Sequence, residues 1–122
     1  MRKGMEKQQQ IEEVVRPFLD TYMSARPQSI LVDLHDSHVL VTLRQVICPA
    51  EREYARERTS RERLERLSSE AFDGVKAELE KAVTRIMGRT VLQSLISLDP
   101  PTGDAILMLV MEESMKPRQV GM

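Results

Sequence analysis

The sequence is poor in aromatic residues, cysteine and glycine, and each shortage excludes a class of function. Aromatic residues make up 3% of the 122 residues, too few for a base-stacking platform or an aromatic cage. The single cysteine, Cys48, cannot form an intramolecular disulfide or a cysteine-based zinc site, so a reducing cytosol suits the chain. The five glycines are scattered and build no phosphate-binding loop. The sequence also has no nucleophile elbow.

Long hydrophobic runs are missing as well. The longest uninterrupted apolar run, 105–111, has seven residues. A membrane-spanning helix needs about 20. The basic start of the chain is followed by polar residues rather than by an apolar signal segment. We therefore expect a cytoplasmic protein that does not insert into a membrane and that reaches a membrane surface only through a partner.

The residues that are present favour a single soluble domain. Hydrophobic residues make up 41% and charged residues 30% of a 14.0 kDa chain, enough for one core with a soluble exterior. Eighteen basic and nineteen acidic residues give a net charge of -1. No global field therefore steers the chain to nucleic acid or to an anionic membrane.

Two segments have apolar residues repeating at three and four positions, which predicts amphipathic helices. In the first, residues 7–25, Pro17 either kinks the helix or opens a second segment. The second runs over residues 49–87 and ends at Gly88, with a break at Thr59-Ser60 left open. Its apolar stripe is expected to face a core and consists of Leu64, Leu67, Ala71, Val75, Leu79, Ala82, Val83 and Ile86.

Alternating apolar and polar residues predict two β-hairpins. The first joins residues 29–34 to 38–45, and the second joins 90–98 to 105–112 through a loop rich in turn formers. The order helix, hairpin, long helix, hairpin predicts an α+β fold with a four-stranded, mainly antiparallel sheet and helices on one face. The pattern leaves the strand order open. We expect one domain over residues 1–112 and a flexible C-terminal tail over 113–122.

The last predicted strand is apolar on both sides, and both sides need cover. Ile106, Met108 and Val110 face one way, and the residues between them face the other. Because the helices cover one face of the sheet, the other face predicts a homodimer. In the alternative, the long helix and the tail wrap around a single sheet. The expected interface residues are Leu31, Leu40, Leu95, Leu107, Leu109 and Met111.

Residues 51–66 carry six arginines and five glutamates in alternation. This interleaving favours a solvated or partner-facing helix surface over a stripe that binds RNA or phosphate. Opposite charges four residues apart are expected to pair. The expected pairs are Glu57 with Arg61, Arg58 with Glu62, Arg61 with Glu65 and Glu62 with Arg66.

Two groups of residues could carry chemistry, and for both a structural interpretation is simpler. Asp33, His35, Asp36 and His38 at the first hairpin tip form the only metal-like constellation, but polar residues at a tip usually make the turn and contact water. Cys48 has no histidine nearby in the sequence to activate it as a nucleophile. We assign no catalytic, cofactor-binding or metal residue, expect no cofactor, and lean towards a protein that is not an enzyme.

Residues 46–52, followed by 88–91 and a hairpin with an acidic turn, resemble a bacterial family named after MpsC, a component of a sodium-translocating, membrane-potential-generating system. The resemblance covers roughly residues 11–112. The family's Leu-Thr-Pro-Ala-Glu motif is a helix start, in which Thr caps and Pro takes the first turn. It is matched here by Ile47, Cys48, Pro49, Ala50 and Glu51.

The resemblance implies a soluble partner of an ion-translocating membrane system and brings no catalytic residues. Together with the sheet pattern it predicts a noncatalytic cytoplasmic homodimer that binds a protein at a membrane transport complex. The alternative is a regulatory dimer that senses a small ligand or an anion at the dimer seam or at the hairpin tip.

Overall fold

The computed structural model describes residues 3–113 and has the predicted α+β order of elements. These are helix α1 (Lys3–Met23), strands β1 (Ser29–Leu34) and β2 (His38–Arg44), helices α2 (Pro49–Tyr54) and α3 (Arg58–Met87), and strands β3 (Val91–Asp99) and β4 (Asp104–Met111). Apart from Glu113, the tail expected over 113–122 lies outside the described residues.

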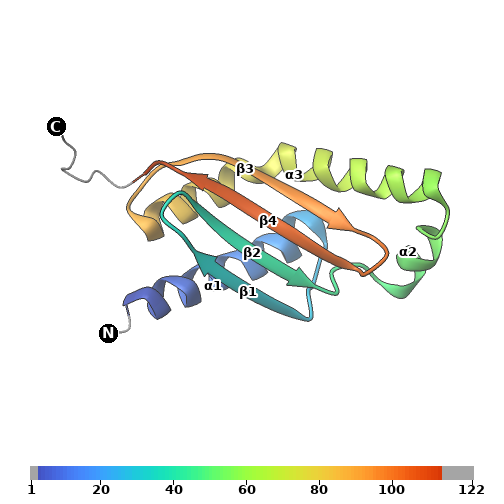
Figure 1. Ribbon diagram of the computed structural model, residues 1–122, viewed down its shortest axis with the longest axis horizontal. Coiled ribbons are helices and arrows are strands. Elements are labelled where there is room, and N and C mark those ends of the chain that lie inside the picture. Colours follow the sequence, from blue (N-terminus) through green and yellow to red (C-terminus); the bar gives the residue numbers. More distant parts are fainter. Residues whose placement is uncertain (1–2, 114–122) are drawn as a thin grey trace.

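The four strands form one antiparallel sheet in the order β1-β2-β4-β3. Each predicted hairpin forms, and the two hairpins join through their second strands, so that Val39 lies opposite Leu109 and Val41 opposite Leu107. A register shift between Val91 and Gln93 marks a bulge near the start of β3. Figure 1 shows β2 and β4 at the centre of the sheet and β1 and β3 at its edges.

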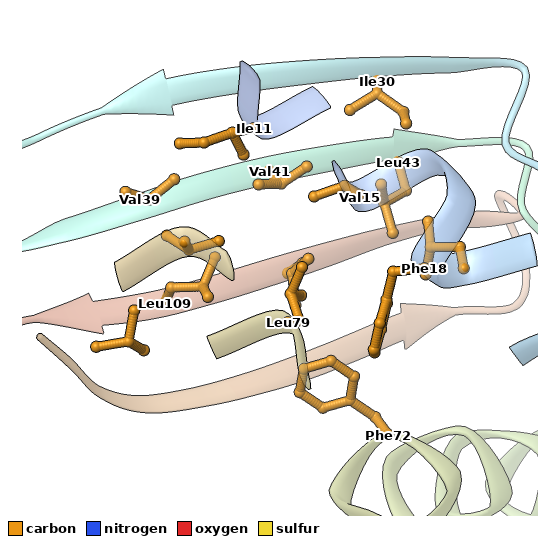
Figure 2. Packing of buried hydrophobic residues seen from close by; sticks show 14 of the residues in the cluster. Ile11, Val15, Phe18, Ile30, Val39, Val41, Leu43, Phe72, Leu79 and Leu109 are labelled. Atoms are coloured by element: carbon orange, nitrogen blue, oxygen red, sulfur yellow. The ribbon is translucent and has the colours of Figure 1, made fainter. Parts of the chain in front are cut away.

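Helices α1 and α3 pack side by side against one face of this sheet (Figure 1). Their buried side chains meet those of the strands in a single core, which Figure 2 shows from close by. The rings of Phe18 and Phe72 meet edge to face with centroids 6.2 Å apart and so link α1 to α3. Each large apolar side chain buried in this way stabilises the fold by about 1.5–3 kcal/mol.

Helix α1 is continuous through Pro17, so no second segment opens there. The helix buries Ile11 and Val15, while Pro17 itself is exposed. On the same helix, the Gln8 side-chain amide donates to the carbonyl of Val32, with 2.9 Å between Nε2 and the oxygen. This bond satisfies a backbone carbonyl of the edge strand β1.

The break in the long helical segment lies earlier than Thr59-Ser60, the position left open by the sequence. Helix α2 ends at Tyr54 and α3 begins at Arg58, because Glu57 adopts an extended backbone with φ -87° and ψ 140°. The other end of α3 is as predicted: Gly88 has φ 72° and its N–H donates to the carbonyl of Thr84. A residue without a side chain suits that left-handed conformation.

The apolar stripe of α3 reaches the core only in its second half, which corrects the expectation for its first half. Leu79 and Val83 are buried, whereas Leu67 is 55% exposed. In Figure 1 the N-terminal end of α3 extends beyond the end of the sheet. Leu64, Leu67 and Ala71 of this half line a hollow with Ile96 and Leu98 of β3 instead of closing against them. Phe72, which the stripe omitted, is the first fully buried residue of α3.

Candidate functional site

The main candidate site is the face of the sheet that the helices leave uncovered. Among residues 3–113 no helix packs on this face, which is turned towards the viewer in Figure 1. Leu31, Leu95 and Ile106 expose 56%, 40% and 37% of their surface there. We call this surface the open sheet face and define it by the apolar residues Leu31, Leu40, Leu95, Ile106, Met108 and Val110.

Strand register brings these side chains together. Met108 of β4 lies opposite Leu40 of β2 on one side and opposite Leu95 of β3 on the other, so three apolar side chains form a row across the sheet. Residues directly opposite on one face are near enough to be in contact. Ile106 and Val110 flank this row along β4. Leu40, Leu95, Ile106, Met108 and Val110 therefore form a contiguous apolar patch, and Leu31 is separated from Ile106 by Thr42.

Three of the six expected interface residues lie on the other face of the sheet. Leu107 and Leu109 are 0% exposed and Met111 is buried beside them beneath the helices, so these residues belong to the core. The sequence could not separate the two faces of β4 because both are apolar. The pairing of β4 with β2 shows which face of β4 is buried, because Val41, which lies opposite Leu107, is also fully buried.

Of the four metal-like residues, Asp33 lies in β1, His38 is the first residue of β2, and His35 and Asp36 lie in the turn between them. The rings of His35 and His38 stack with centroids 4.5 Å apart, and the His35 N–H donates to the His38 carbonyl at 2.9 Å. Asp36 lies beside the guanidinium of Arg89, 3.9 Å from its carboxylate oxygen to Nη1. Within the described residues, no three His, Cys, Asp or Glu side chains are grouped so as to hold a metal ion.

Arg89 is a connecting residue that the sequence analysis did not single out. Its Nη1 donates to the carbonyl oxygens of Asp36 and Glu112, both at 2.6 Å, and so ties the β1–β2 turn to the residue that follows β4. The feature of the sequence that could have pointed to Arg89 is its position directly after Gly88, where the long helix ends. The charge-assisted bonds hold one end of the sheet together.

The segment that resembles the family motif forms the start of α2. Cys48 occupies the N-cap position with φ -81° and ψ 163°, and Pro49 is the first helical residue. The backbone N–H of Cys48 donates to the Glu51 carboxylate at 3.0 Å, which is the glutamate half of a capping box. The Cys48 side chain is exposed. The geometry of this segment is that of a helix start.

The charged segment pairs differently from the expectation. Of the four expected ion pairs, Arg58 with Glu62 forms, at 3.2 Å, and the other three are not among the ion pairs of residues 6–113. The break before α3 takes Glu57 out of the helix, and Arg61 instead donates to the carbonyl of Ala55 at 3.2 Å. The side chains of this segment are mostly exposed.

Comparison with known proteins shows to which family the chain belongs. Between residues 3 and 113, no helix combines the length and the apolar character of a membrane span. Neither the curated proteins nor the solved structures give a match. A family model described as Na+-translocating membrane potential-generating system (MpsC) matches residues 3–113. Because this match covers nearly the whole chain, the protein belongs to the MpsC family.

Proposed function

We propose that this chain is a noncatalytic interaction module of a Na+-translocating membrane-potential-generating system. It acts as a cytoplasmic homodimer that binds a protein component of that system at the membrane surface. The description of the family supplies the system. The observation that carries the proposal is the open sheet face, where Leu31, Leu95 and Ile106 are exposed together with other apolar residues. An apolar patch of this kind is typical of a protein interaction surface.

A second copy of the chain suits the open sheet face because the surface combines an apolar centre with a polar rim of both charge signs. Asp33 of β1 lies opposite Leu40 of β2, and Arg44 lies beyond Thr42 at the end of β2. A two-fold axis brings the same surface of both copies together, so an acidic and a basic rim residue can face each other. The two apolar centres then cover one another.

The surfaces that remain free in such a dimer are those of α1 and α3 on the opposite side of the sheet and of α2 at its end. The charged side chains of α2 and of the first half of α3 are mostly exposed to solvent. A rim or surface of mixed charge selects a protein partner by complementary charges. We propose that this side contacts the other component of the system.

The dimer is tested by light scattering coupled to size-exclusion chromatography at micromolar concentration. We expect a mass close to twice the 14.0 kDa of one chain. Ile106→Lys places a charge beside the central row of the open sheet face and should produce monomers with an unchanged circular dichroism spectrum. Leu67→Lys changes an exposed leucine on α3 and should leave the dimer intact. A monomeric wild type, or a dimeric Ile106→Lys variant, contradicts the proposal.

The partner is tested by affinity purification from the native organism after the membranes have been solubilised. We expect the tagged chain to recover other subunits of a Na+-translocating system. The same purification is repeated from one strain that carries Leu67→Lys and from another that carries Ile106→Lys. Loss of the partner subunits with Leu67→Lys points to the helix side, and their loss with Ile106→Lys points to the dimer face. Recovery of the tagged chain alone counts against the proposed partner.

A further inference from the structure

A hollow lined by three arginines lies between α2, the turn after it and the β3–β4 turn. Its accessible volume is about 440 Å³. Arg52 comes from α2, Arg56 from the turn and Arg61 from the first turns of α3. Charges of both signs alternate along the sequence, but the helix break brings arginines from separate elements to the same hollow.

Two of these arginines are held by neutral groups. The Arg61 guanidinium donates to the carbonyl of Ala55 at 3.2 Å, and that of Arg52 donates to the carbonyl of Pro101 at 3.5 Å. The Arg52 side chain crosses close to Gly103, where an added Cβ would lie 3.4 Å from Cδ of Arg52. A backbone carbonyl therefore holds each of the two side chains without neutralising its charge, and Gly103 leaves room for that of Arg52.

Among the residues that line the hollow, three arginines stand against one carboxylate. Glu53 is the one carboxylate among the lining residues, and it pairs with Arg56 at 3.2 Å. Within the described part of the chain, neither Arg52 nor Arg61 forms an ion pair with a carboxylate. Two guanidinium charges therefore face the hollow unneutralised, in a chain whose net charge is -1.

We propose that this hollow binds a phosphate group, carried either by a lipid headgroup or by a small soluble phosphate. The planar guanidinium fork matches the oxygens of a phosphate and can donate two parallel hydrogen bonds to it. The volume leaves room for a tetrahedral anion between the arginines together with part of its carrier. This site goes beyond the proposed function, because it adds a ligand to a module proposed to bind proteins.

The test uses the full chain and two probes in a low-salt buffer. Inorganic phosphate is titrated by calorimetry, and phosphatidylcholine vesicles with or without phosphatidic acid are used in a sedimentation assay. Binding to dissolved phosphate identifies a soluble ligand, and binding only to the vesicles that contain phosphatidic acid identifies a headgroup. Both results support the phosphate site, and the affinity should fall as salt is added because exposed charges are screened.

Variants connect the binding to the hollow. Arg52→Gln and Arg61→Gln should each weaken binding about tenfold, as expected for a charge-assisted hydrogen bond that is partly exposed. Arg66→Gln makes the same charge change on α3 outside the hollow and should have little effect. Glu53→Gln removes the one lining carboxylate and should tighten binding, a direction that damage to the fold does not produce.

Failure of this site and failure of the proposed function are separable, because the dimer and its partner are measured without phosphate. If neither probe binds, the proposal is wrong. It is equally wrong if Arg66→Gln weakens binding as much as Arg61→Gln does, or if Glu53→Gln leaves the affinity unchanged.

Discussion

Two neighbouring residues of β4 provide a controlled measurement of which face of the sheet is buried. Leu107 is 0% exposed and Ile106 is 37% exposed, and their side chains are isomers with the same number of carbons. Substitution by alanine removes the same three carbons from each position. The difference between Leu107→Ala and Ile106→Ala therefore reports the environment of the side chain rather than its chemistry.

We expect Leu107→Ala to lower the free energy of unfolding by about 3 kcal/mol. Three carbons at about 0.8 kcal/mol each give most of this, and the cavity left between the sheet and the helices adds the rest. Ile106→Ala should cost about 1.5 kcal/mol in a dilute sample, because its side chain is partly in water already and no closed cavity forms. A typical urea dependence converts these values into midpoint shifts of about 2 M and about 1 M.

The assay is equilibrium urea denaturation, followed by circular dichroism at low protein concentration and repeated at high concentration. Equal costs for the two variants, or a larger cost for Ile106→Ala in the dilute sample, would refute the assignment of faces. If a second copy covers the open sheet face, the wild type becomes more stable as its concentration rises, and Ile106→Ala reduces that gain.

Three further changes test local features of the fold. Cys48→Thr gives α2 a hydroxyl acceptor at its N-cap and should increase the free energy of unfolding by about 0.5–1 kcal/mol. Differential scanning calorimetry should show this as a higher melting temperature. Gly88→Ala should cost about 1–2 kcal/mol because Gly88 has φ 72°, whereas Gly74→Ala, inside α3 with nothing within 4 Å, should stabilise by about 0.5–1 kcal/mol in the same denaturation assay. Arg89→Ala breaks the bonds to Asp36 and Glu112 and should speed amide hydrogen exchange at that end of the sheet.

The features that the sequence predicted well are those that depend on nearby residues. Both hairpins follow from alternation over a few residues, and the end of α3 follows from Gly88, because the left-handed backbone it adopts is costly for other residues. The family membership was likewise visible in a short motif around Pro49.

The features that the sequence missed depend on residues far apart along the chain. The core side of β4 is decided by its neighbour β2, which lies more than sixty residues earlier, so the interface set mistakenly included Leu107, Leu109 and Met111. The exposure of Leu67 could not be read from periodicity either, because the apolar repeat of the helix continues where α3 and the sheet leave a hollow between them. The arginine hollow arises because the break after Tyr54 reorients the charged segment.

The bond between Gln8 and the Val32 carbonyl affects how many copies of the sheet can join edge to edge. A filament that grows by adding strands needs two receptive edges on every subunit, since each new copy binds to one edge and offers the other. Here α1 occupies a carbonyl on the β1 edge with a side chain of the same protein. A strand that paired with the β1 edge would lose a hydrogen bond to this carbonyl, so open-ended growth through that edge is disfavoured.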